Sequence, residues 1–151
     1  MVPVDTDDYT SCLANFENGA VGLFDASRIS TGDRLESSLE IRGSRGAVKW
    51  DYQNFNFIEL YISGSSDIDG FRKVYTSEPD FPYMDGYYGM AGHGQHYDSL
   101  IIHQIYDLLG SISKNTMPSP NFKDGLKAQR VLEAIEQAHK EKRWVKIEEV
   151  N

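Results

Sequence analysis

The chain of 151 residues contains a single cysteine, Cys12, so it cannot form an internal disulfide bond. A fold without disulfides suits a reducing compartment. No apolar run approaches the roughly 20 residues that a membrane-spanning helix needs. The first residues also lack the basic region and the apolar segment of a signal peptide. Together these absences predict a cytoplasmic protein with no membrane partner.

Positive charge is also scarce. The chain has 15 lysine and arginine residues against 23 aspartate and glutamate residues, which gives a formal net charge of −8. Because phosphate backbones and anionic headgroups repel such a chain, nucleic acid and membrane surfaces are poor partners. Hydrophobic residues make up 40% of the sequence and aromatic residues 12%, which is typical of a globular chain. We expect a single domain over residues 1–151.

The first half of the sequence favours strands. Short segments with alternating apolar residues are separated by glycine and asparagine turns, which predicts a mainly antiparallel meander of about six strands. Asn18-Gly19 is expected to supply the two positive-φ residues of a tight hairpin turn. The predicted strands are residues 9–17, 20–28, 35–42, 47–52, 55–62 and 71–75.

The second half favours helices. From Tyr97 onward, apolar residues recur at helical spacing until Pro118 and Pro120 forbid continuation. Asn121, with Asp124 three residues later, predicts a capping arrangement that opens a second helix. Residues 144–147 alternate like a short closing strand. The predicted fold class is therefore α+β, with an open-faced, mainly antiparallel sheet and helices packed on one face.

A long aromatic segment, residues 76–96, connects the sheet to the helices. Ordered loops of this length are uncommon and usually functional. Its rings suit the apolar faces of sugars, and the tyrosine hydroxyls can reach sugar oxygens. The alternative is a lid that packs its rings on the sheet. The rings are Phe81, Tyr83, Tyr87 and Tyr88.

Several short motifs follow one another along the chain. They are FENGAVG at 16–22, EIRGSRGAVKW at 40–50, Gly92-His93 followed by His103-Gln104, PNFKDGLKAQRVLEAI at 120–135, and Arg143-Trp144-Val145. In this order they resemble the C-terminal domain of the Gfo/Idh/MocA oxidoreductases. The resemblance implies the dehydrogenase C-terminal domain fold. It also implies substrates among sugars and polyols, and a homodimer formed through the open sheet face.

The chain departs from the full-length enzymes of that family at the cofactor site. Gly89, Gly92 and Gly94 lie in an aromatic loop without the strand that precedes a nucleotide cradle. The family's Glu-Lys-Pro motif is missing, and its catalytic Asp and His lie upstream of this sequence. We therefore expect an absent N-terminal Rossmann domain, with no catalytic and no cofactor-binding residue in this chain. NAD or NADP is implied for the full-length enzyme only.

Four residues are candidates for substrate binding: His93, Arg28, Tyr87 and Tyr88. A neutral imidazole at His93 would hydrogen-bond or deprotonate a substrate hydroxyl, although a histidine here would equally cap the coming helix or bond the loop backbone. Arg28, which ends the second strand, would hold a hydroxyl or a carboxylate. Its alternative is a salt bridge to Asp25, Asp33 or Glu36.

The histidines also raise the question of a metal. His93, His96 and His103 would form a set of three, but no acidic or cysteine partner stands at a recognised ligand spacing. We therefore predict no metal site.

Three hypotheses for function follow. The preferred one is the substrate-binding and oligomerisation half of an NAD(P)-dependent sugar or polyol oxidoreductase, not catalytically competent alone. The alternative is a non-catalytic carbohydrate-binding or scaffolding module derived from that domain. A metal hydrolase built on the histidines is remote.

Overall fold

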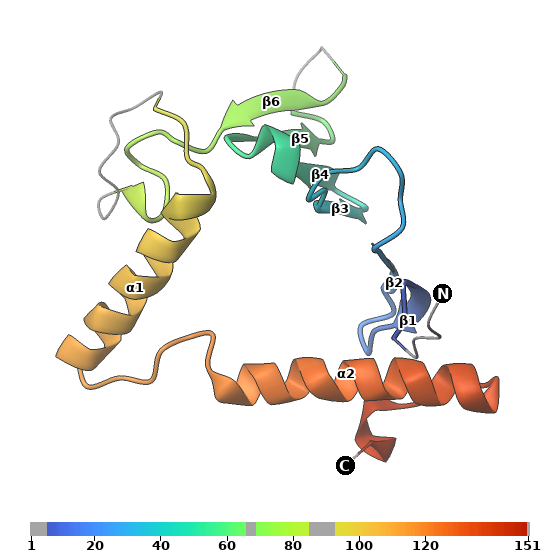
Figure 1. The fold of residues 1–151 in the computed structure, drawn as a ribbon. Helices are drawn as coiled ribbons and strands as arrows, with labels where there is room; N and C mark the ends of the chain where they lie inside the picture. The colour runs from blue at the N-terminus through green and yellow to red at the C-terminus, as the bar shows by residue number, and fades with distance from the viewer. Residues whose placement is uncertain (1–5, 66–68, 85–92, 151) are drawn as a thin grey trace. The chain divides into compact units, whose positions relative to one another are not determined.

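The structure is a computed structural model that describes residues 6–65, 69–84 and 93–150 (Figure 1). These residues form six strands, two α-helices and two short 3-10 helices. The chain divides into two compact units, Met1–Asp33 with Pro120–Asn151, and Arg34–Ser119. The first unit combines the two ends of the sequence, and the second holds its middle.

A β-hairpin opens the first unit. Strand β1 (Tyr9–Asn15) pairs antiparallel with β2 (Val21–Ser27). The amide of Gly19 donates to the carbonyl of Phe16 at 2.9 Å, and Gly19 has a φ of 83°. Asn18 does not share the positive φ, so the predicted pair of left-handed residues is wrong. The connection is longer than a two-residue turn, and such loops need a left-handed glycine only at their end.

Helix α2 (Phe122–Glu141) begins with a reciprocal cap, as the sequence predicts. Asn121 Oδ1 accepts a hydrogen bond from the amide of Lys123 at 2.8 Å, and Asp124 Oδ2 accepts one from the amide of Asn121 at 3.0 Å. That second bond is the main reason why the pKa of Asp124 lies below its ordinary value. Two amides that a helix start leaves without helical partners are thus satisfied by side chains.

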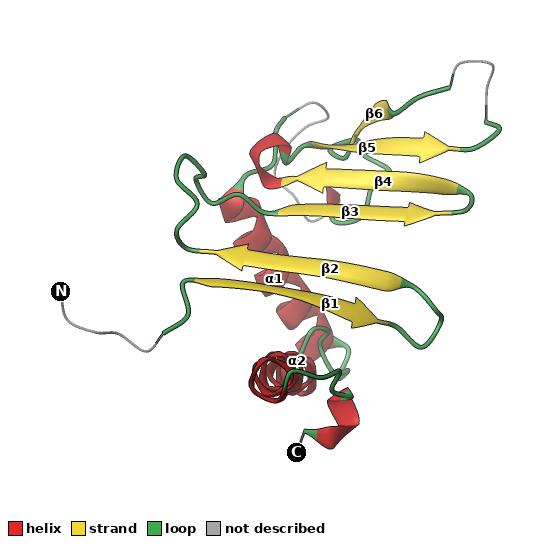
Figure 2. Cartoon of the chain, turned by 90° about the vertical axis from the view of Figure 1, so that its right-hand side faces the viewer, coloured by secondary structure: helices red, strands yellow, loops and turns green. Residues whose placement is uncertain are grey.

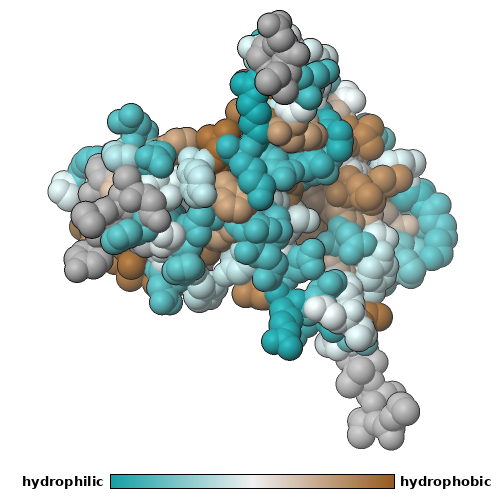
Figure 3. Space-filling view, turned by 90° about the horizontal axis from the view of Figure 1, so that it is seen from above, coloured by the Kyte–Doolittle hydropathy of each residue, from teal (hydrophilic) through white to brown (hydrophobic). Residues whose placement is uncertain are grey.

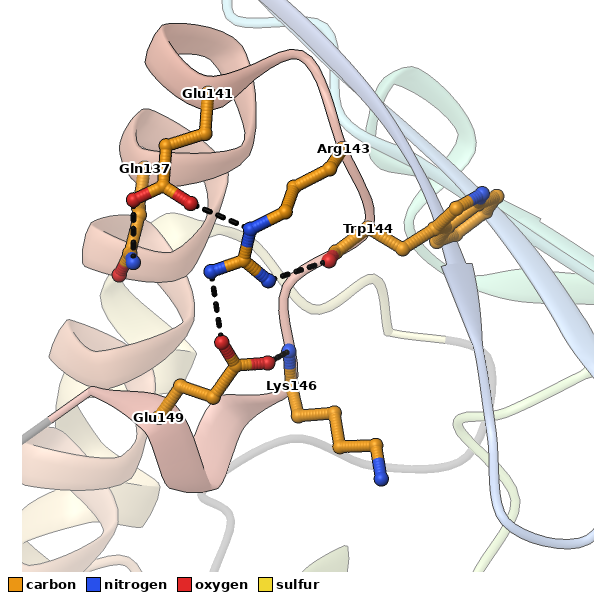
Figure 4. A network of polar contacts seen from close by, with 6 residues as sticks. All are labelled: Gln137, Glu141, Arg143, Trp144, Lys146 and Glu149. Carbon is orange, nitrogen blue, oxygen red and sulfur yellow. Dashed lines mark hydrogen bonds and ion pairs between the residues drawn. The ribbon is translucent and has the colours of Figure 1, made fainter.

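The chain after α2 does not form the predicted closing strand. Residues Ile147–Glu149 form a short 3-10 helix, η3. Glu149 fixes this turn, because its carboxylate accepts from the amide of Lys146 at 2.9 Å and from Arg143 Nη2 at 2.8 Å (Figure 4). Arg143 also contacts Glu141, so one guanidinium joins the helix end to the turn. These bonds stabilise a turn, although the weak alternation of apolar residues at 144–147 predicts a strand.

The second unit contains a four-stranded sheet, shown in Figure 2. Its order is β3-β4-β5-β6, and every neighbouring pair is antiparallel. The strands are β3 (Ser38–Gly43), β4 (Gly46–Asp51), β5 (Phe57–Ile62) and β6 (Arg72–Tyr75). With the hairpin they give six antiparallel strands, in two sheets. The α+β class and the antiparallel meander are therefore confirmed.

The two faces of this sheet differ in chemistry. Directly paired residues share a face, because side chains alternate along each strand. We call one the apolar face; it carries Leu39, Ile41, Val48, Trp50, Ile58, Leu60 and Val74, with the charged Arg72 on the edge strand. We call the other the charged face; it carries Glu40, Arg42, Lys49, Phe57, Glu59, Tyr61, Lys73 and Tyr75.

Helix α1 (Tyr97–Ser113) starts where the apolar periodicity predicts. Many apolar side chains of both helices are exposed, including Ile105, Leu109 and Leu132. Figure 3 shows hydrophobic residues in brown beside hydrophilic ones in teal at the surface. No helix among the described residues is long and apolar enough to cross a membrane. The packing of helices on one sheet face stays a prediction.

Candidate functional site

Asn56 anchors the segment that leads into α1. It lies just before β5, and its carbonyl accepts a hydrogen bond from the amide of Thr76 at 2.9 Å. Its side-chain Oδ1 accepts another from the amide of Gln95. One residue thus binds the chain that leaves β6 and the chain that approaches α1. Both ends of the aromatic segment are held at the same place in the second unit.

Gly94 permits this close approach. A Cβ atom added at Gly94 would lie 3.0 Å from Asn56 Nδ2, tighter than ordinary van der Waals contact. Glycine at position 94 is therefore explained by local packing and not by a nucleotide site, because its backbone passes close to the side-chain amide of Asn56. The bond from Gln95 to Asn56 depends on that closeness.

A shallow cavity of about 250 Å³ lies beside this anchor, within the second unit. It is lined by the β4–β5 connection, residues 52–57, together with His96 and Tyr97. The connection contains η1 (Tyr52–Asn54), whose start is fixed by Asp51 Oδ1 accepting from the amide of Gln53 at 2.8 Å. Aromatic rings beside amide and imidazole groups suit a small polar molecule with apolar faces, such as a sugar.

A second cluster joins the aromatic segment to α1. The ring of Tyr83 stacks on the imidazole of His103, with centroids 5.0 Å apart and an interplanar angle of 21°. A hydrogen bond to Asp107 raises the pKa of Tyr83 above its ordinary value, and the negative charge of that carboxylate acts in the same direction. Tyr83 therefore packs on the helix, not on the sheet as the lid alternative expects. Its φ of 70° is unusual for an aromatic residue.

His93 is exposed and lies in the segment before α1. It does not cap the helix; the capping residue is His96, whose amide donates to Ser99 Oγ at 3.1 Å. The capping role that the sequence allows for His93 is therefore taken by His96. Helix capping does not explain His93, and its contact with substrate stays a prediction.

Arg28 follows β2 in the first unit, where its amide donates to the carbonyl of Asp8 at 2.7 Å. Asp25, one of its proposed salt-bridge partners, accepts a hydrogen bond from the Tyr9 hydroxyl at 2.6 Å. Since Arg28 and His93 belong to different units, their sharing of one site stays a prediction. Tyr87 and Tyr88 lie outside the described residues.

The positions of the histidines bear on the prediction that the chain has no metal site. Across residues 6–65, 69–84 and 93–150, no group of three or more His, Cys, Asp or Glu side chains is arranged to hold a metal ion. His96 caps α1 and His103 stacks on Tyr83, so each has a structural role of its own.

The described residues do not fit a nicotinamide dinucleotide either. Phosphate cradles of this kind need a glycine-rich turn between a strand and a helix. Here the glycine turn at 43–46 joins two antiparallel strands. The start of α2 is already occupied by the carboxylate of Asp124, which would repel a phosphate. No step of a hydride transfer is assigned to these residues.

Sequence reasoning missed three contributors to the cavity and its anchor: Asn56, His96 and Tyr97. His96 caps α1 with Ser99 three residues later, but neither is the usual residue at its position in a capping box, so the sequence carries only a weak signal for this cap. Asn56 carries no comparable signal, because its two bonds join residues distant in the sequence.

Comparison with known proteins places the chain in context. A family model described as the C-terminal alpha/beta domain of the Gfo/Idh/MocA oxidoreductases matches residues 2–147. Levoglucosan dehydrogenase from Pseudarthrobacter phenanthrenivorans is 30% identical over 150 residues, which is 99% of this chain and 38% of that enzyme. The chain thus spans well under half the length of that relative.

The chain also resembles solved oxidoreductase structures. The crystal structure of an oxidoreductase domain protein from Kribbella flavida has a TM-score of 0.91 and 36% identity, covering 97% of this chain and 38% of that one. Levoglucosan dehydrogenase in complex with NADH and L-sorbose has a TM-score of 0.91 and 31% identity, covering 97% and 39%. The same enzyme with NADH and levoglucosan has a TM-score of 0.90.

Proposed function

We propose that this chain, which belongs to the Gfo/Idh/MocA oxidoreductase family as its C-terminal alpha/beta domain, is the substrate-binding and oligomerisation half of an NAD-dependent sugar dehydrogenase. The observation that carries the proposal is the match over nearly the whole chain to enzymes solved with NADH and a sugar. The chain supplies sugar contacts and a subunit interface, and a separate cofactor half supplies the hydride acceptor.

The cavity beside Asn56 is the proposed sugar-contacting surface of this half. Tyr52 and Tyr97 provide ring faces for the C–H surfaces of a sugar, and His96 provides an imidazole for its hydroxyls. His93, Arg28, Tyr87 and Tyr88 remain proposed substrate contacts of this chain.

Three finer assignments belong to the same proposal. Polyols join sugars as substrates because both present rows of hydroxyl groups. NAD is favoured over NADP because the solved relatives are complexes with NADH. The protein is proposed to act in the cytoplasm, since its single free cysteine suits a reducing compartment. It is also proposed to act as a homodimer.

Titration followed by backbone amide NMR tests the sugar-binding proposal. Levoglucosan and L-sorbose, added to tens of millimolar, are expected to shift the amides of residues 52–57 and 93–97. The amides of α2, residues 122–141, serve as the internal control and should stay in place. The variant His96→Asn keeps a capping side chain and should weaken the shifts at least several-fold.

Two results would contradict the proposal. One is the absence of shifts with every sugar and polyol tried, while the protein remains folded. The other is a set of shifts confined to residues outside the cavity. Shifts in the cavity with a long carbohydrate chain but with no monosaccharide would favour the alternative, a carbohydrate-binding module.

A further inference from the structure

The cavity beside Asn56 has two walls that come from distant parts of the sequence. One wall is the β4–β5 connection, residues 52–57, and the other is the start of α1, with His96 and Tyr97. A ligand that touches both walls is held only as accurately as the walls are held to each other. The contacts that fix their separation therefore matter for binding as much as the lining side chains do.

A hydrogen bond from the second wall to Asn56 fixes this separation. Asn56 belongs to the first wall, and its Oδ1 accepts from the amide of Gln95, the residue just before His96. The next amide, that of His96, donates to Ser99 Oγ at 3.1 Å, and the amide of Ser99 donates to the carbonyl of His96 at 2.9 Å. Two consecutive amides thus bind in different directions, one to the first wall and one to the helix.

The chain around the Gln95 amide has little room to move. The backbone of Gly94 passes so close to Asn56 that an added Cβ would lie 3.0 Å from Nδ2. The side chain of Gln95 is also held, because its Nε2 donates to Met84 Sδ at 3.1 Å and Met84 is buried. A shift of the Gln95 amide would therefore move the start of α1, and with it the second wall.

Asn56 makes a second hydrogen bond that is independent of its side chain. Its backbone carbonyl accepts from the amide of Thr76 at 2.9 Å, next to the end of β6. A substitution at position 56 can therefore remove the bond between the walls and leave the bond to Thr76 in place. This makes the contribution of the side chain measurable by itself.

We infer that Asn56 is a positioning residue for sugar binding: its Oδ1 atom holds the Gln95 amide and thereby fixes the separation of the two cavity walls. This inference rests on the proposed function of the cavity as a sugar-contacting surface. It adds the residue that holds one wall against the other. Asn56 acts through His96 and Tyr97, and needs no contact of its own with the sugar.

Two substitutions of Asn56 test the inference by titration of the full chain with levoglucosan, followed by amide NMR. Asn56→Ala removes Oδ1 and is expected to raise the Kd for the sugar about five- to ten-fold. Asn56→Asp keeps an acceptor for the Gln95 amide, and its charge strengthens that bond, so the Kd should stay within about two-fold of the unmodified chain. If Asn56 instead bound the sugar through Nδ2, both substitutions would weaken binding, and that result overturns the inference.

Amide hydrogen exchange without sugar shows whether the intended bond has been removed. In Asn56→Ala the Gln95 amide should exchange about ten-fold faster or more, whereas the Thr76 amide keeps its protection. Gly94→Ala is the second variant, for the case in which Asn56→Ala loses protection at both amides. It displaces the Gln95 amide but leaves the side chain of Asn56 intact, and should weaken sugar binding to the same extent.

Asn121→Ala is the matched control. It also removes an asparagine side chain that accepts from a backbone amide, but at the start of α2 in the first unit. Its sugar affinity should stay within about two-fold of the unmodified chain, because distant sites act independently. An equal loss of affinity in Asn121→Ala would trace the effect to general destabilisation and overturn the inference.

The outcomes separate the inference from the proposed function. Weaker binding in Asn56→Ala and Gly94→Ala, with retained binding in Asn56→Asp, supports the inference. Unchanged binding in a variant whose Gln95 amide has lost its protection overturns the inference and leaves the sugar site standing. An unmodified chain that binds no sugar overturns the proposed function and the inference together.

Discussion

At the scale of single residues, the glycines differ in how closely other atoms approach them. A Cβ atom at Gly94 would lie 3.0 Å from Asn56 Nδ2, whereas one at Gly110, inside α1, would have nothing within 4 Å. The first position maintains the contact between the loop and β5. The second merely weakens a helix, because glycine is a poor helix former.

Gly94→Ala is therefore expected to destabilise the protein by about 1 kcal/mol or more, because the added methyl pushes Gln95 away from Asn56 and breaks their hydrogen bond. Gly110→Ala should raise stability by up to about 1 kcal/mol. Urea unfolding of both variants measures the difference. Equal effects of the same sign would contradict the assigned role of Gly94.

Residue-scale sequence reasoning predicted the cap of α2, where the chemistry is local, but missed the contacts between residues distant in the sequence. Asn121 and Asp124 cap α2 as their spacing predicts, because the two bonds join residues three positions apart or fewer. Asn56 and Gln95 are separated by 39 positions, and Tyr83 and His103 by 20. No spacing rule reaches that far, so the anchor and the stacked pair were visible only in three dimensions.

At the scale of elements, the helices follow from periodicity and the strands from alternation. The start of α1 at Tyr97 and the six strands agree with the sequence to within a few residues. The exception is the segment after α2. Four alternating residues predict a strand, but Arg143 and Glu149 together stabilise a turn. A short alternating pattern carries little weight against several side-chain bonds to the backbone.

The cap of α2 gives a prediction at this scale. Asn121→Ala removes the side-chain acceptor for the amide of Lys123 and should cost about 1 kcal/mol of unfolding free energy. Lys123→Ala is the matched control, since only the backbone of Lys123 takes part in the cap. It should change stability by no more than about 0.5 kcal/mol. A loss of the same size in both variants, measured by thermal or urea unfolding, would refute the cap as the cause.

At the scale of the whole molecule, the sequence motifs pointed to the correct family because they are distributed along almost the entire chain. The matched model covers residues 2–147, and the quoted motifs begin at 16 and end at 145. The same motifs could not predict that Glu40, Lys49, Glu59 and Lys73 stand side by side on one sheet face, because this arises from pairing between four strands. Composition shows only that acids and bases are present. Register decides which of them become neighbours.

Cofactor binding gives a prediction at the scale of the whole molecule. Among the described residues, the start of α2 does not suit a phosphate, because the carboxylate of Asp124 lies there and would repel it. The net charge of −8 further opposes a dinucleotide that carries two phosphates.

The isolated chain is therefore expected to bind neither NADH nor NADPH, and calorimetry should detect no saturable heat at micromolar to millimolar dinucleotide. Full-length levoglucosan dehydrogenase, which has been solved in complex with NADH, is the positive control under the same conditions. Asp124→Asn tests the reason, because removing the carboxylate frees the helix start from its negative charge but builds no glycine turn. That variant should still not bind. A micromolar Kd for either dinucleotide with the unmodified chain would show that these residues contain a nucleotide site, and would remove the physical basis for assigning hydride transfer to a separate half.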